Sequence, residues 1–214
     1  MSYFDFNQFC DLIRDFGGDV FGAPQEWKNV KIEIKKSAKG SKFFFDSKSK
    51  INSLSIIDYW GGNEIHVGQG SKLTGGIKIG RNCKLIIGNL VSFTANPIFH
   101  ISESTSLVIG DDCMFGSGVS FYTHDYHPIY ELNTKNRLNI SKDISIGNHV
   151  WCANNSVILK GTKIGNGSVL GAYYICSSEI PDNCVAAGNP AEVKRKNIFW
   201  TRDSFNTTQS FGLD

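Results

Sequence analysis

A repeat with a period of six residues runs from Ile146 to Cys176. Its first places hold aliphatic residues or cysteine, and most of its second places hold glycine or alanine; the first-place residues are Ile146, Cys152, Ile158, Ile164, Leu170 and Cys176. A period of six fits neither an amphipathic helix nor a simple alternating strand. It is typical of a hexapeptide β-helix, in which six residues form one flat face and three faces make a coil. We therefore predict an all-β solenoid whose first-place side chains point into a narrow prism.

The six-residue phase extends back to Val67. Aliphatic or aromatic residues recur six apart from Val67 to Phe121, except that Pro97 and Glu103 stand at two of these places. A charged side chain is costly in an apolar interior, so we expect the coil to be distorted at Glu103. After Phe121 the phase breaks, because Ile146 lies 25 positions later. We predict that the polar residues 123–143 form a loop that leaves the solenoid, where function usually resides in repeat proteins.

The N-terminal segment has a different pattern. Apolar residues at helical spacing precede Gly17-Gly18 and predict a short helix over 3–16; they are Phe9, Leu12, Ile13 and Phe16. A solenoid must cover its open end, so this helix is expected to form a cap within residues 1–29. Alternating apolar residues from Val30 predict irregular strands that begin a β-helix domain over 30–189.

The C-terminal segment, 190–214, is predicted to contain a helix and a tail. Pro190 suits the first turn of a helix. Val193, Ile198 and Phe199 would then lie on one side of that helix. The polar tail from Asn206 is expected to be mobile.

The composition excludes several classes of protein. With 22 Lys+Arg against 20 Asp+Glu, the charge balance does not call for nucleic acid as a partner. We find no apolar run of about 18 residues, so no integral membrane segment is expected. The first residues lack the basic start and apolar run of a signal peptide. The six cysteines form no C-x-x-C pair, so we interpret them as buried thiols of a cytoplasmic protein.

Three motifs in order resemble those of the hexapeptide-repeat O-acetyltransferases that use acetyl-CoA. They are I-G-N-H-V-W, I-L-K-G-T-K-I-G-N-G-S-V-L-G-A and A-A-G-N-P-A-E-V-K-R. The run S-F-Y-T-H-D-Y-H, together with N-H-V-W, is most similar to bacterial capsule and polysialic acid O-acetyltransferases. The resemblance implies a left-handed parallel β-helix, a homotrimer with active sites between subunits, acetyl-CoA as co-substrate and no metal.

The resemblance also implies a catalytic pair. His127 stands before Pro128 and 24 positions ahead of Trp151, as the family places its catalytic histidine before its tryptophan. A neutral imidazole can accept the proton of an attacking hydroxyl near pH 7. His124 is the competing base. In the alternative role, His124, Asp125 and Tyr126 would contact the acceptor sugar, and Asp125 could orient a histidine.

Matching the family's motifs residue by residue gives a set of cofactor-binding positions. These are Ala153, Asn154, Gly171, Ala172, Ser177, Gly188, Pro190, Lys194 and Arg195. The backbone of Gly171 and Ala172 would bind the pantetheine arm, and Lys194 and Arg195 the phosphates. Tyr173-Tyr174 and Glu192 depart from the family pattern and predict a modified channel for acetyl-CoA.

The function that this resemblance implies is transfer of an acetyl group to a sugar hydroxyl, in a capsular or other surface polysaccharide that could contain sialic acid. An acetyltransferase for an amino sugar or an antibiotic is the alternative. A zinc hydratase on the same fold would need three histidines at a subunit interface, whereas the loop offers only H-x-x-H. A non-catalytic assembly module would have no need of the histidine, the tryptophan and the G-N-P-A motif together.

Overall fold

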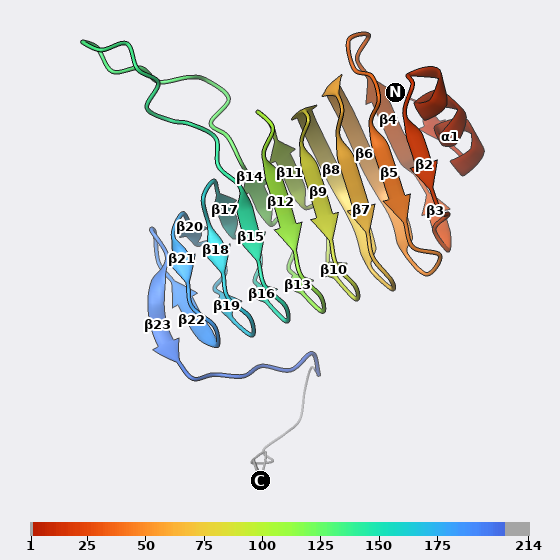
Figure 1. The fold of residues 1–214 in the computed structure, drawn as a ribbon. Helices are drawn as coiled ribbons and strands as arrows, with labels where there is room; N and C mark the ends of the chain where they lie inside the picture. Colours follow the sequence, from red (N-terminus) through yellow and green to blue (C-terminus); the bar gives the residue numbers. More distant parts are fainter. Residues whose placement is uncertain (1, 204–214) are drawn as a thin grey trace.

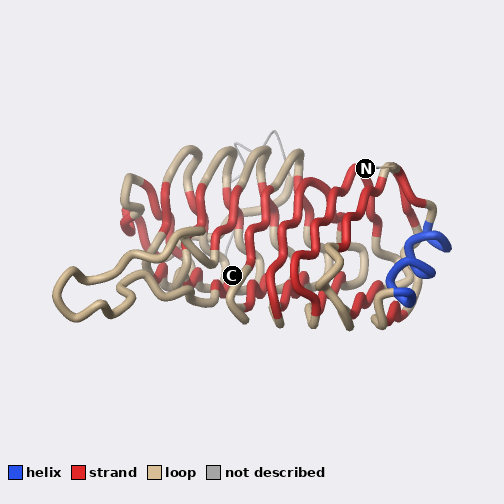
Figure 2. The backbone as a smooth tube through the Cα atoms, turned by 90° about the horizontal axis from the view of Figure 1, so that it is seen from above, coloured by secondary structure: helices blue, strands red, loops and turns tan. Residues whose placement is uncertain are grey.

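In the computed structural model, which describes residues 2–203, the chain begins with β1 (Tyr3–Phe4) and helix α1 (Phe6–Asp15). The Asp5 side chain accepts the backbone N–H of Gln8, and the Gln8 side chain bonds back to the N–H of Asp5. The helix buries Phe9 against Phe43 of the first coil. It covers the N-terminal end of the stack (Figures 1 and 2), so the predicted N-terminal helix is confirmed.

From Asp19 the chain winds through three sheets, which we name A, B and C and which pair mainly in parallel (Figure 1). Sheet A holds β1, β3 (Glu26–Lys28), β4 (Val30–Ile34), β6 (Lys50–Gly61), β8 (Lys72–Arg81), β11 (Ile98–Ile101), β14 (Ser120–Tyr122), β17 (Val157–Leu159) and β20 (Ile175–Cys176). Sheet B holds β2 (Asp19–Phe21), β5 (Lys42–Phe45), β7 (Glu64–Val67), β9 (Lys84–Ile87), β12 (Ser106–Ile109), β15 (Ile144–Ile146), β18 (Lys163–Ile164) and β21 (Glu179–Ile180). Sheet C holds β10 (Ser92–Phe93), β13 (Met114–Phe115), β16 (Trp151–Cys152), β19 (Val169–Leu170), β22 (Cys184–Ala187) and β23 (Glu192–Lys196).

The interior is filled by rows of apolar side chains that continue from coil to coil. On sheet A, for example, one row joins Ile77, Phe99, Phe121 and Ile158 in register. All four are at most 1% exposed, and the rings of Phe99 and Phe121 stack with centroids 5.1 Å apart. Because each coil contributes one layer to a continuous core, its stability depends on its neighbours. The predicted parallel β-helix is confirmed.

The coils before the loop are longer than the six-residue period predicts. Gly76 pairs with Ile98, 22 positions later, whereas Trp151 pairs with Val169, 18 positions later. In the long coils, the strands of sheets A and B are each extended by two residues. Adding two residues to a strand preserves the alternation of inward and outward side chains, so the predicted inward residues remain buried. The six-residue period, however, does not determine the length of these coils. Glu103 causes no distortion of the interior, because it lies exposed at a corner with a φ of 58°.

A ladder of Asx side chains lines the corner between sheets B and C. Each Asx side chain accepts the backbone N–H of its counterpart one coil earlier, at 2.7–2.8 Å, and the ladder comprises Asn89, Asp111, Asn148, Asn166 and Asp182. The glycine before each of the first four is needed for close approach: a Cβ on Gly110 would lie 2.7 Å from the carbonyl oxygen of Gly147. The small second residue of the repeat therefore reflects crowding by the next coil.

Replacing Gly110 with alanine is expected to lower the free energy of unfolding by about 1–3 kcal/mol, because the added methyl group overlaps the backbone of the next coil. Gly76→Ala is the matched control: a Cβ there meets nothing within 4 Å, and the change should fall within about 0.5 kcal/mol of wild type. Urea unfolding followed by circular dichroism measures both. Equal stability of the two variants would show that the coils can separate to admit the methyl group.

The predicted C-terminal helix is wrong. Residues 192–196 form β23, which pairs antiparallel with β22. This strand occupies the last edge of sheet C, whose backbone groups would otherwise lack partners, and that requirement outweighs the helical spacing of the side chains. The chain then turns back at Asn197, whose φ is 57°. The tail predicted from Asn206 lies outside the described residues.

Residues 123–143 lie between β14 and β15 and project far from the solenoid, at the corner between sheets A and B (Figures 1 and 2). All six cysteines are buried and unpaired, as expected for thiols. Over residues 2–203 we find no helix that is long and apolar enough to cross a membrane.

Candidate active site

The base of the 123–143 loop is fixed by one nearly buried asparagine. Asn139 donates its side-chain amide to the Asp125 carboxylate at 2.9 Å and to the carbonyl of His127 at 2.8 Å. Its side-chain oxygen accepts the N–H of Ile129 at 2.7 Å. Because Asn139 is only 9% exposed, these bonds are shielded from water, and they join the outgoing and returning arms of the loop around His127.

The Asp125 carboxylate attaches this loop to the solenoid. In addition to the Asn139 amide, it accepts a hydrogen bond from the Lys160 ammonium, on the turn that follows β17. The Lys160 bond lowers the pKa of Asp125 and keeps the carboxylate ionised. Asp125 also contacts His127 through the backbone, since its carbonyl accepts the His127 N–H at 2.7 Å.

His127 thus combines a fixed backbone with an unengaged side chain. Its N–H and its carbonyl are both hydrogen-bonded, and Pro128 restricts the backbone of His127, the residue before it. Among residues 2–203 the exposed imidazole has no hydrogen-bond, ionic or ring partner. Both ring nitrogens are therefore available to a substrate, as a general base requires.

His124 is in a different state. Its Nδ1 accepts the backbone N–H of Tyr126 at 3.1 Å, and its ring packs edge-on against the Tyr126 ring. Burial lowers the pKa of His124, so the ring is neutral near pH 7. A neutral imidazole that accepts at Nδ1 carries its proton on Nε2. In this arrangement His124 can donate a hydrogen bond to a substrate but cannot take a proton from it.

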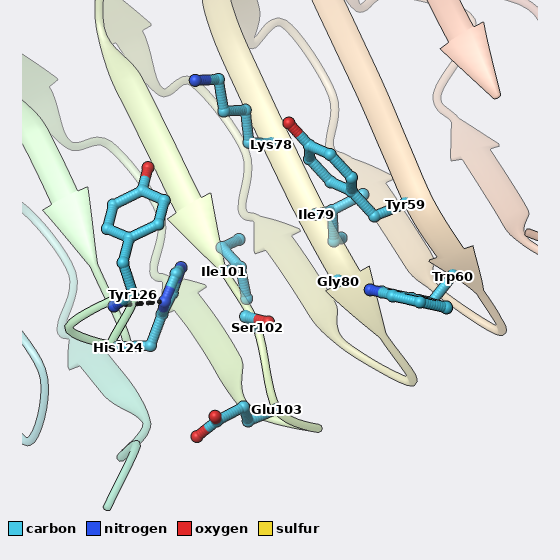
Figure 3. A pocket seen from close by; sticks show the side chains of 10 residues that line it. All are labelled: Tyr59, Trp60, Lys78, Ile79, Gly80, Ile101, Ser102, Glu103, His124 and Tyr126. Atoms are coloured by element: carbon cyan, nitrogen blue, oxygen red, sulfur yellow. Dashed lines mark hydrogen bonds between the residues drawn. The ribbon is translucent and has the colours of Figure 1, made fainter. Parts of the chain in front are cut away.

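A cavity of about 320 Å³ lies beside the loop on the outer surface of sheet A (Figure 3). Tyr59 and Trp60, from β6, form one side of it, and His124 and Tyr126, from the loop, form the opposite side. Tyr126 is held there by a hydrogen bond from its hydroxyl to His100. Rings facing a cavity with polar groups between them provide the apolar and hydrogen-bonding contacts that a sugar needs.

Among residues 2–203, the Lys and Glu side chains that line this cavity are Lys78 and Glu103. Glu103 lines the cavity but is paired with Arg137 at 2.8 Å, and that bond holds its pKa below the usual range. Lys78 also lines the cavity, and no carboxylate of the described chain pairs with it. Burial, with a smaller effect of Lys78, lowers the pKa of His100 to about 4, so this histidine is neutral. The cavity therefore favours an anionic group near Lys78.

Trp151 lies on another side of the molecule. It is the first residue of β16, points outward from sheet C and is 36% exposed. The loop that carries His127 leaves the corner between sheets A and B, and Figure 1 shows the two segments on opposite sides of the solenoid. A single chain does not bring the predicted catalytic pair together.

Most of the predicted cofactor residues lie along one corner, where sheet C passes into sheet A in successive coils. Ala153 and Asn154 follow β16, Gly171 and Ala172 follow β19, and Gly188 follows β22. The Asn154 side chain accepts the N–H of Ser117, and the N–H of Gly171 donates to Ala186 at 3.0 Å, so the solenoid itself uses these groups. Within the described chain the N–H of Ala172 has no partner and remains available to a ligand.

The other predicted cofactor residues have mixed positions. Pro190, after a cis peptide bond, continues the same corner. Ser177 follows β20 and therefore lies at the corner between sheets A and B. Lys194 and Arg195 are exposed on β23, and Lys194 is paired with Glu192 at 3.0 Å. Tyr173 lies at the corner between sheets C and A, where it is 70% exposed with a φ of 63°. Tyr174 packs on the core.

The sequence interpretation missed Asn139, Lys160 and Lys78. The sequence did indicate the position of Lys78, because this residue stands between the apolar Ile77 and Ile79, which are buried, and so must point outward from its strand. No sequence pattern indicated Asn139 or Lys160, since they contact Asp125 from 14 and 35 positions away. In residues 2–203 no group of three His, Cys, Asp or Glu side chains is placed to hold a metal ion.

No family model matches the sequence. The chain is 33% identical over 138 residues to a polysialic acid O-acetyltransferase of Escherichia coli O1:K1. This match covers 64% of this chain and 45% of that protein. It is 41% identical over 109 residues to the polysialic acid O-acetyltransferase of Neisseria meningitidis, a match that covers 50% of this chain and 51% of that protein. The crystal structure of the polySia-specific acetyltransferase NeuO superposes with a TM-score of 0.73 at 28% identity, covering 86% of this chain and 89% of that one.

The chain is homologous to polysialic acid O-acetyltransferases over half to two thirds of its length and shares the fold of the acetyltransferase NeuO over most of it. The left-handed winding predicted for this chain is that of its structural neighbours. The chain spans about half the length of the curated relatives that it matches. The comparisons therefore identify the fold of this chain.

Proposed function

We propose that this protein transfers an acetyl group from acetyl-CoA to a hydroxyl of an acidic surface polysaccharide. The observation that carries the proposal is His127: an unengaged imidazole on a backbone fixed by Asn139, directly after the cavity-lining Tyr126. The resemblance of His127 and Trp151 to the family's catalytic pair supports the same assignment. We place the reaction in the cytoplasm, where buried thiols stay reduced.

In the proposed reaction His127 acts as a general base. As the sugar oxygen forms its bond to the thioester carbonyl carbon, the imidazole takes the hydroxyl proton. The carbonyl becomes an oxyanion, which the Trp151 indole N–H or the free Ala172 N–H would stabilise by donating a hydrogen bond. When the C–S bond breaks, the imidazolium returns its proton to the departing thiolate. The products are an acetyl ester and free CoA.

We further propose a homotrimer in which the site is shared. His127 and Trp151 lie on opposite sides of one chain, so they can act together only if two copies of the chain meet. The loop supports this, since it exposes six large apolar side chains in a single chain: Tyr126, Ile129, Tyr130, Leu132, Leu138 and Ile140. Such a surface is typical of one that a partner covers.

Lys78 supports an acidic acceptor. Its ammonium lies on the outer surface of β8, where the neighbouring Glu103 is already neutralised by Arg137. A sugar carboxylate bound at this point would gain a charge-assisted hydrogen bond, which a neutral sugar cannot make. The similarity to polysialic acid O-acetyltransferases agrees with this assignment.

The test is acceptor-dependent release of CoA from acetyl-CoA, measured with sialic acid polymers, uronic acid polymers and neutral sugars. We expect turnover with a carboxylated acceptor, and an increase of about tenfold in the acceptor KM for Lys78→Met with no change in KM for acetyl-CoA. Lys72→Met, on the same strand and also exposed, is the control. If turnover occurs only with an amino sugar or an antibiotic, the proposed acidic polysaccharide is wrong and that compound is the acceptor. No turnover and no binding of acetyl-CoA would leave a non-catalytic module.

A further inference from the structure

Residues 197–203, which we name the strap, run from the last coil back along the solenoid (Figure 1). The N–H of Ile198 donates to the carbonyl of Asn183 at 3.0 Å. Trp200 bonds to His149, in an earlier coil, and Arg202 bonds to Asp112, in a coil earlier still. The strap therefore links successive coils through residues that lie 15 to 112 positions apart in sequence.

The strap is firmly anchored by Arg202. Its Nε donates to the Asp112 carboxylate at 2.6 Å, and Nη1 donates to the Ser92 hydroxyl at 3.0 Å. Nη2 donates to the carbonyls of Leu90 and Cys113, at 3.0 and 2.9 Å. Four of the five N–H bonds of the guanidinium are thus satisfied by this one position, which marks a specific contact.

His149 lies between the strap and the same carboxylate. Its Nδ1 is 2.6 Å from the Asp112 carboxylate, and its Nε2 is 2.9 Å from the carbonyl oxygen of Trp200. Both partners can only accept. A neutral imidazole has one N–H, so both bonds form only when His149 is protonated. The ring also stacks on the Trp200 indole at 4.1 Å, which favours a cation.

Trp200 connects this contact to the proposed active site. Only 9% exposed, it donates its indole N–H to the carbonyl of His149 at 2.9 Å. Its ring lies 6.0 Å from that of Trp151, measured between centroids, at an angle of 46°. Trp200 therefore supports one side of the exposed Trp151 ring.

We propose that Trp200 is a positioning residue for Trp151 and that protonation of His149 closes the strap. The assignment of Trp151 to acetyl-CoA rests on the proposed function, whereas closure of the strap does not. Only the protonated imidazole donates to both acceptors, so the strap is held more firmly at low pH than at high pH.

The charged groups around His149 determine how this equilibrium responds to pH. Asp112, on the turn between β12 and β13, faces both His149 and Arg202. Burial raises the pKa of Asp112, but the bonds from His149 and Arg202 outweigh it and lower the pKa overall. Asp111, the other carboxylate at this corner, is engaged by the N–H of Asn89 at 2.7 Å. Within this cluster His149 is therefore the group that needs an added proton to form both of its bonds, to Asp112 and to Trp200.

Closure is tested by hydrogen exchange of the full-length protein at about pH 6 and about pH 8.5, with rates for the 197–203 peptide normalised to the unfolded peptide. We expect protection to fall about tenfold or more at the higher pH in wild type, and His149→Gln to show equal, weaker protection at both. Thr201→Ala, exposed on the strap, should behave as wild type. Equal protection of wild type at both pH values would overturn closure by His149.

The positioning role is tested by kinetics and by equilibrium binding of acetyl-CoA. Trp200→Ala is expected to weaken acetyl-CoA binding about fivefold or more and to leave the acceptor KM unchanged, and Trp200→Phe to restore most of the loss. Unchanged acetyl-CoA affinity in a folded Trp200→Ala protein would refute the role of Trp200. If wild type neither binds acetyl-CoA nor transfers acetyl groups, the proposed function fails, and so does the role of Trp200, while the exchange experiment still decides closure.

Discussion

Replacing His127 with alanine is expected to lower kcat by about 10²–10⁴-fold, with the KM for acetyl-CoA changed by less than a few-fold. Without the imidazole, the sugar hydroxyl has no base to accept its proton as it attacks. Release of CoA, followed with a thiol reagent, gives both constants. The melting temperature should stay within a few degrees of wild type, because the His127 side chain is exposed and the loop is held by backbone bonds.

His124→Ala is the matched comparison, since it removes a histidine three positions away from the same loop. We expect it to raise the acceptor KM and to retain a larger part of kcat, because Nδ1 of His124 is occupied by the N–H of Tyr126. If His124→Ala abolishes turnover and His127→Ala does not, His124 is the base and our assignment of the two roles is reversed.

Mixing two inactive variants is expected to restore activity. In a shared site, a His127→Ala chain still supplies Trp151, and a Trp151→Ala chain still supplies His127. Random assembly of the two at equal amounts gives intact sites with a probability of about one quarter, so coexpressed variants should reach roughly that fraction of wild-type kcat. Either variant alone should stay at its low level.

The control mixes His127→Ala with the double variant His127→Ala/Trp151→Ala, which together contain no intact His127 and cannot assemble a complete site. Restoration in the first mixture and not in the second requires that the two residues come from different chains. If the first mixture remains inactive while sedimentation shows mixed oligomers, then each site is built within one chain, and the opposite placement of His127 and Trp151 must change on assembly.

The sequence determined the solenoid and the loop that carries the candidate site. The buried first-place residues, such as Ile158 and Leu170, and the small residues beside them, such as Gly147, repeat because every coil meets the same neighbours. The polar residues 123–143 interrupt that repeat and identify the loop. These signals are local and periodic, so they can be found without coordinates. Periodicity could not fix the coil length, because two extra residues in a strand preserve its alternation.

Only the tertiary structure decided which groups meet. Asn139 and Lys160 converge on Asp125, and Trp200 reaches His149 across 51 positions, because stacked coils bring distant residues to one corner. The C-terminal strand depended on the same effect: side-chain spacing favoured a helix, but the open edge of β22 offered backbone partners that a helix would have left unpaired. Spacing in sequence encodes the face on which a side chain lies, whereas the partner it meets there depends on how the coils stack.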